Sequence, residues 1–204
     1  DLPHQANPKL ALLPGSRSGE IKANWPTMRQ TCQQLVEKYP AIHFVVAATT
    51  PTIGQTIQKD LSATSLPIQV EVDQTHAILS WCDLTLVVSG TATLHVAAYQ
   101  KPMVALFNIN WLSWQLIGRW IVQTRTFTLP NLIGQCDPTN HIVPEWVPHF
   151  GKTAPIVESL TELIENPTAR EKQCQLFKQI EQIYQDQSFE TNVASHLLEA
   201  IENQ

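Results

Sequence analysis

Near the start of the chain, Leu10-Ala11-Leu12-Leu13-Pro14-Gly15-Ser16-Arg17-Ser18-Gly19-Glu20-Ile21 joins an apolar run of strand length to a small polar loop, and an amphipathic helix is expected beyond it. A buried strand that enters such a loop brings backbone N–H groups and a guanidinium to the carboxyl edge of a sheet, where α/β folds bind their ligands. Arg17 can hold a pair of phosphate oxygens with two parallel hydrogen bonds. Taken alone, the loop is interpreted equally well as a structural turn, because many such loops contain Gly and Ser.

Outward from this stretch, strand and helix patterns alternate. A near-continuous apolar run at 42–48 predicts a parallel strand covered on both faces, and further strands are predicted at 68–72, which is short, and at 84–88 and 103–107. The predicted helices are one with an N-cap at Asn24 and Pro26 in its first turn, ended by Pro40, and three more at 53–61, 74–81 and 91–99. This alternation predicts an α/β fold, a Rossmann-like doubly wound parallel sheet.

The last part of the chain is less regular. Residues 129–133 and 142–146 are apolar segments interrupted by prolines, which is typical of loops at a sheet edge. The tail predicts three helices, at 156–165, 168–186 and 190–202. We therefore expect a linker at 1–7, a Rossmann-like domain at 8–165, and C-terminal helices at 166–204 that pack on this or another domain.

Residues 109–122 contain three tryptophans, Trp111, Trp114 and Trp120, in an almost wholly apolar setting. A helix buried between two layers explains this composition and is slightly favoured. The alternative is a patch that faces a partner domain or the headgroup region of a membrane.

The composition restricts the classes of function. The 204 residues carry a formal charge of −5, which argues against a nucleic-acid-binding surface. The four cysteines show no CxxC spacing and the histidines no HExxH pattern, so neither a metal site nor a redox motif is indicated. No signal peptide and no apolar run of about 18 residues is visible. A cytoplasmic location is therefore expected, with a peripheral position on a membrane left open.

A second polar loop, Ser89-Gly90-Thr91, follows the predicted strand 84–88 and opens a helix that Thr91 or Ser89 can cap. Two such loops that face one crevice indicate a binding site. Neither is a Walker motif or a complete GxGxxG, so P-loop and dinucleotide sites are disfavoured. His95, one turn into the helix, is expected to point toward the crevice, although most lone histidines on helices pack or face solvent. Asn131 is interpreted as a turn residue or as an amide that bridges ligand and loop.

Together these pieces resemble the lipid-A-disaccharide synthase family. The resemblance is carried, in the family's order, by Leu12-Leu13-Pro14-Gly15-Ser16-Arg17 with Glu20-Ile21, Ser89-Gly90-Thr91-Ala92-Thr93-Leu94, Lys101-Pro102-Met103-Val104, Leu129-Pro130-Asn131-Leu132-Ile133 and Val143-Pro144-Glu145. It covers residues 8–200 and corresponds to the C-terminal half of the family's two-domain GT-B fold. An N-terminal partner domain is therefore expected outside this sequence.

The family transfers an acylated glucosamine from UDP to a lipid-linked glucosamine 1-phosphate in lipid A biosynthesis, and its C-terminal half binds the UDP-sugar donor. The resemblance implies that Arg17 and the Gly15-Ser16 backbone bind the diphosphate. It also implies that Ser89, Gly90 and Thr91 hold phosphate or sugar, and that Asn131 lines the donor site. No metal or cofactor is implied, and the catalytic base is expected in the other half of the enzyme.

Two positions depart from the family. The family usually has glutamate, expected to bind the ribose hydroxyls, where this chain has His95, which can still hydrogen-bond a hydroxyl. Where the family tends to carry Tyr-Lys or Tyr-Arg, this chain has Phe107-Asn108, so one basic contact is absent. Two alternatives stay open: another GT-B enzyme for UDP-sugars, such as a UDP-N-acetylglucosamine 2-epimerase, and a non-catalytic nucleotide-sugar binding module.

Overall fold

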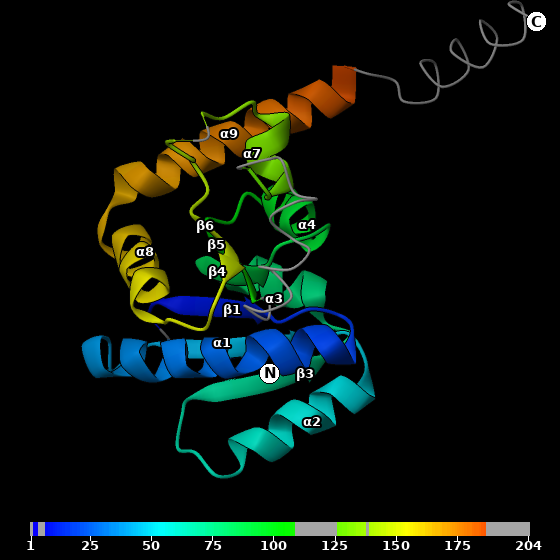
Figure 1. Ribbon diagram of the computed structural model, residues 1–204, viewed down its shortest axis with the longest axis vertical. Helices are drawn as coiled ribbons and strands as arrows, with labels where there is room; N and C mark the ends of the chain where they lie inside the picture. The colour runs from blue at the N-terminus through cyan, green and yellow to red at the C-terminus, as the bar shows by residue number, and fades with distance from the viewer. Residues whose placement is uncertain (1, 4–6, 109–125, 138, 187–204) are drawn as a thin grey trace, which may run out of the picture.

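The computed structural model describes residues 2–3, 7–108, 126–137 and 139–186 (Figure 1). Its strands are β1 (Lys9–Leu13), β2 (His43–Ala48), β3 (Ile68–Val72), β4 (Leu84–Val88), β5 (Met103–Asn108) and β6 (Glu145–His149). Its helices are α1 (Ser18–Lys38), α2 (Pro51–Leu61), α3 (Thr75–Trp81), α4 (Ala92–Ala98), α7 (Leu129–Ile133), α8 (Ala154–Glu165) and α9 (Pro167–Asp186).

The strands form one sheet in the order β3-β2-β1-β4-β5-β6, and every neighbouring pair is parallel. This order confirms the predicted doubly wound sheet. The chain moves outward from β1 to β3 and then returns to the other side of β1 with β4. The order of the strands therefore reverses between β1 and β4, and a crevice opens outside their carboxyl ends in folds of this kind.

Helices cover both faces of the sheet, so the four inner strands β2, β1, β4 and β5 are mostly apolar and buried. Leu10 and Leu12 face a core that also contains side chains of α1, α2 and α8. Ala11 and Leu13, on the opposite face, pack in a core with side chains of α3, α4 and α9. Figure 1 shows α1 running alongside β1. The alternation of side chains along a strand thus supplies two hydrophobic cores from one continuous apolar run.

Helix α1 begins at Ser18, earlier than predicted. Asn24 is therefore not its N-cap, and Pro26 lies in its interior. Pro26 donates no backbone hydrogen bond, which normally destabilises a helix. Two side-chain amides bind carbonyls near it: Asn24 Nδ2 donates to the Glu20 carbonyl at 2.8 Å, and Asn108 Nδ2 donates to the Ala23 carbonyl at 2.8 Å. Contacts from the side chains therefore support the helix around the proline.

Of the two proline-interrupted segments expected to be loops at a sheet edge, 129–133 is instead a helix, whereas 142–144 is irregular and only residues 145 and 146 enter a strand. Leu129–Ile133 forms α7, with its proline in the first turn, where the missing N–H costs little. Glu145–His149 forms β6, the outer strand beside β5. Pro148 lies within this strand and is tolerated because the outward side of an edge strand has no partner to bind.

The tail follows the prediction over the described residues. Helices α8 and α9 meet at Asn166, whose side-chain oxygen accepts hydrogen bonds from the backbone N–H groups of Thr168 and Ala169. The predicted helix 190–202 and the tryptophan-rich segment 109–122 lie outside the described residues. Within the described part of the chain, every helix is too short or too polar to cross a bilayer.

Candidate functional site

A cavity of about 800 Å³ lies at the carboxyl ends of β1 and β4, where the strand order reverses. It is lined by seven of the residues singled out in the sequence: Gly15, Ser16, Arg17, Ser89, Gly90, Thr91 and His95. The two polar loops are about 70 residues apart in the chain and are brought together because β1 and β4 are neighbouring parallel strands. We refer to this cavity as the switch-point pocket.

The loop after β1 is organised by Glu20, which sequence reasoning did not include among the site residues. Its Oε2 atom accepts hydrogen bonds from the backbone N–H groups of Ser16 at 2.9 Å and Arg17 at 3.3 Å. Its Oε1 atom accepts a hydrogen bond from Arg17 Nη1 at 2.8 Å. The Arg17 side chain is otherwise open, with 82% of its surface exposed.

Burial raises the pKa of Glu20, but the hydrogen bonds from Ser16 and Arg17 outweigh burial and leave the pKa below its usual value. Glu20 is therefore ionised at neutral pH. The sequence signal for this contact is the spacing of a capping box, because Glu20 lies three residues after Arg17, the residue that precedes the helix. The N–H groups expected to face a ligand are thus already bound to a carboxylate.

Gly15 makes this arrangement sterically feasible. Its φ is +108°, a conformation that residues with a side chain rarely adopt. A Cβ atom at Gly15 would lie 2.6 Å from Glu20 Oε2 and 2.8 Å from Glu20 Cβ. The close approach of Glu20 to the loop therefore requires glycine at this position.

The second loop is held by backbone and hydroxyl contacts, and neither the Ser89 nor the Thr91 side chain makes the hydrogen bond that would cap α4. Thr91 is the N-cap residue, but its side chain makes no capping hydrogen bond. The Ser89 N–H donates to the Leu106 carbonyl at 2.8 Å, and its hydroxyl donates to the Phe127 carbonyl at 3.4 Å. The Ser89 hydroxyl thus ties this loop to the segment that precedes α7.

His95 lines the pocket within a small aromatic cluster. Its ring centroid lies 5.0 Å from that of His76 and 5.7 Å from that of Tyr99, and the Tyr99 hydroxyl contacts His76 Nδ1. Burial, and secondarily repulsion from His76, lower the pKa of His95. The imidazole is therefore mainly neutral at pH 7. In that state it offers one donor and one acceptor, which suits a hydroxyl group of a ligand.

Asn131 is not among the residues that line the switch-point pocket. It is fully buried, and its amide exchanges two hydrogen bonds with the backbone of Val143, at 2.8 and 3.0 Å. It also donates to Glu145 at 3.2 Å. Glu145 in turn accepts the backbone N–H groups of Phe127 and Thr128. In this structure Asn131 therefore fastens α7 to β6, and its amide is occupied by protein partners.

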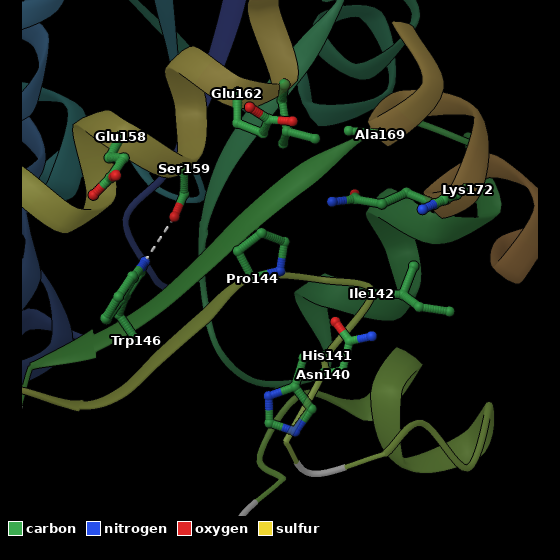
Figure 2. A pocket seen from close by; sticks show the side chains of 12 residues that line it. Asn140, His141, Ile142, Pro144, Trp146, Glu158, Ser159, Glu162, Ala169 and Lys172 are labelled. Atoms are coloured by element: carbon green, nitrogen blue, oxygen red, sulfur yellow. Dashed lines mark hydrogen bonds between the residues drawn. The ribbon is translucent and has the colours of Figure 1, made fainter. Parts of the chain in front are cut away.

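A second cavity, of about 440 Å³, lies beside the edge strand β6, between it and helices α8 and α9 (Figure 2). Figure 2 shows Glu158 and Ser159 of α8 on one side and Lys172 of α9 on the other. Trp146 closes part of it, with its indole N–H donating to the Ser159 hydroxyl at 3.2 Å. None of the candidate site residues predicted from the sequence lines this cavity. The switch-point pocket is therefore the better candidate site.

The described residues contain no group of three His, Cys, Asp or Glu side chains placed to hold a metal ion. All four cysteines are free thiols. Cys32 and Cys82 are buried, and burial raises the pKa of both thiols, that of Cys82 to about 12. These two cysteines fill the core as protonated thiols, as expected for structural residues.

A family described as Lipid-A-disaccharide synthetase matches residues 1–200. The similar proteins include a lipid-A-disaccharide synthase of Pseudomonas putida, 31% identical over 159 residues, which make up 78% of this chain and 41% of the relative. Another, from Albidiferax ferrireducens, is 36% identical over 138 residues, or 67% of this chain and 34% of the relative. The chain thus spans about two fifths of the length of the first of these relatives and about a third of the second.

Solved structures share the fold at low sequence identity. A UDP-GlcNAc 2-epimerase from Neisseria meningitidis, bound to UDP-GlcNAc, matches with a TM-score of 0.54 at 20% identity, over 85% of this chain and 40% of that one. The structure of TarM matches with a TM-score of 0.63 at 12% identity, over 95% of this chain and 35% of that one. These matches show a common Rossmann-like architecture.

Proposed function

This chain belongs to the lipid-A-disaccharide synthetase family, and from that membership we propose that it is the part of a glycosyltransferase that binds the UDP-sugar donor. In the proposed reaction an acylated glucosamine passes from UDP to a lipid-linked glucosamine 1-phosphate. The observation that carries the proposal is the convergence of the Arg17 loop and the Ser89–Thr91 loop on one pocket at the point where the strand order reverses. Because the acceptor is a lipid, we propose that transfer occurs at the cytoplasmic surface of a membrane.

We assign the diphosphate of the donor to Arg17. Arg17 lines the pocket, and only its Nη1 atom is bound to Glu20, so the rest of the exposed guanidinium is available to phosphate oxygens. Gly90 and Thr91 line the facing wall, where their backbone and hydroxyl groups suit a phosphate or a sugar. His95, mainly neutral at pH 7, suits a hydroxyl of the ribose.

The proposed chemistry depends on charge that develops during transfer. When the glycosidic bond to UDP breaks, negative charge grows on the leaving diphosphate, and a positioned guanidinium stabilises this charge in the transition state. We assign no catalytic base to the described residues. By the family resemblance the base belongs to the other half of the enzyme, so the role proposed for this chain is to bind the donor and stabilise its leaving group.

The proposal is tested by titrating UDP into the chain by isothermal calorimetry. We expect Arg17→Ala to weaken UDP binding by about 1.5–3 kcal/mol, the range for a hydrogen bond to a charged group, or about 10-fold to 150-fold in Kd. Arg29→Ala is the matched control, because Arg29 lies further along α1 in an ion pair with Asp60 and does not line the pocket. Equal UDP affinity in Arg17→Ala and the unaltered chain contradicts the assignment of Arg17.

The alternatives predict different results. A 2-epimerase converts UDP-N-acetylglucosamine without an acceptor, whereas the proposed transferase, joined to the rest of its chain, releases UDP only when the lipid acceptor is present. A non-catalytic binding module retains UDP affinity and releases nothing. UDP release that depends on the acceptor therefore identifies the transferase, and conversion of UDP-N-acetylglucosamine to its 2-epimer distinguishes the epimerase from the binding module.

A further inference from the structure

We propose that Glu20 is a positioning residue that holds the guanidinium of Arg17 in the orientation that receives the diphosphate. This role rests on the function proposed above. It begins from the observation that one carboxylate binds both the backbone and the side chain of the same arginine: Glu20 Oε2 accepts the Arg17 N–H and Glu20 Oε1 accepts Arg17 Nη1.

The contact has a specific consequence for Arg17. An arginine side chain with 82% of its surface exposed samples many rotamers, and binding a ligand then carries an entropic cost for fixing one of them. The hydrogen bond from Nη1 to Glu20 restricts these rotamers before a ligand arrives. It uses only one nitrogen of the guanidinium, so two others remain for a pair of phosphate oxygens.

The backbone of the loop supports the same interpretation. Ser16 and Arg17 donate their N–H groups to Glu20, so these donors are satisfied within the protein. Gly15 adopts a positive φ and leaves room for the carboxylate, which would lie 2.6 Å from a Cβ at that position. The loop is therefore shaped around Glu20, and we infer that the diphosphate is bound by the Arg17 side chain rather than by these two N–H groups.

Charge alone predicts the opposite effect of Glu20 on binding. The carboxylate is negative and lies beside the proposed diphosphate, so its removal strengthens the electrostatic attraction of the pocket for UDP. Loss of positioning weakens UDP binding instead. The sign of the change in Kd in Glu20→Gln therefore distinguishes a positioning residue from a competing anion.

The test is calorimetric titration of UDP and of uridine into the full chain. We expect Glu20→Gln to raise the Kd for UDP about 5-fold to 10-fold, which is within the range for the loss of one ordinary hydrogen bond, and to leave uridine binding within about 2-fold. Glu37→Gln makes the same change of charge at an exposed site near the other end of α1, and its UDP affinity should stay within about 2-fold. General damage to the fold weakens uridine binding as well, so unequal effects on the two ligands identify positioning.

A double-mutant cycle tests whether Glu20 acts through Arg17. In an Arg17→Ala background, Glu20→Gln should change the Kd for UDP by less than about 2-fold. Glu20→Asp, which keeps the charge but is one methylene shorter, should also weaken UDP binding, and it provides a second variant if Glu20→Gln does not fold. Unchanged or tighter UDP binding in Glu20→Gln overturns the positioning role. Failure of the unaltered chain to bind UDP contradicts the proposed function itself.

Discussion

Replacing Gly15 by alanine tests how tightly the loop after β1 is constrained. The new Cβ would meet two atoms of the Glu20 side chain, Oε2 at 2.6 Å and Cβ at 2.8 Å. Neither distance is tolerated, and the Glu20 Cβ is fixed to helix α1, so the carboxylate must leave the loop. The N–H groups of Ser16 and Arg17 then lose their acceptor.

The magnitude has two parts. A residue with a side chain at a positive φ costs about 1–2 kcal/mol relative to glycine. Loss of the contacts that cap α1 costs about 1–2 kcal/mol more. We therefore expect Gly15→Ala to lower the free energy of unfolding by about 2–4 kcal/mol. In a chain of this length each kcal/mol corresponds to about 2–4 °C in the melting temperature.

The assay is urea unfolding followed by tryptophan fluorescence, with Gly19→Ala as the matched control. Gly19 is four residues away in the first turn of α1, and a Cβ there has no neighbour within 4 Å. Alanine favours the helix at that position, so Gly19→Ala should keep or slightly raise stability. A Gly15→Ala chain within about 0.5 kcal/mol of the Gly19→Ala chain refutes the reasoning, because that difference is typical of an inconsequential surface substitution.

Two further predictions concern buried polar groups. Asn131→Ala leaves Val143 and Glu145 without their buried amide partner. It should therefore lower the free energy of unfolding, measured by urea titration, by about 2–4 kcal/mol. The control is Asn140→Ala at an exposed position, and an equally small loss in both variants contradicts the structural role of Asn131. Burial lowers the pKa of His149 below its usual 6.5 in the folded chain. The unfolded chain therefore binds a proton at His149 more readily than the folded chain does, and the free energy of unfolding should fall as the pH drops below about 6.5. His149→Gln should flatten that part of the pH profile of melting temperature, and an unchanged slope counts against the effect.

The sheet and the two pocket loops could be predicted because their signals are local. Each of the four inner strands is a mostly apolar run of strand length, and the loops after β1 and β4 have the polar residues typical of a ligand-binding edge. The strand order then places both loops at one pocket. Periodicity and turn residues in short windows contain all of this information.

The remaining features depend on contacts between distant residues. The proline-bearing segments near Asn131 and Glu145 have weak local signals, and their structure comes from a buried carboxylate and amide that bind each other across 14 positions. The start of α1 was missed because Pro26 is a strong start signal. In the structure, Glu20 caps the helix further upstream and Asn108 supports its interior.

Helix α9 has a consequence for how this polypeptide can be dissected. Gln173 forms two hydrogen bonds with the backbone of Met103, where β5 begins, and Leu176 and Phe177 lie in the core under the sheet. A fragment ending at Glu165 would expose that apolar surface to water. A stable fragment must therefore include α9 at least as far as Phe177.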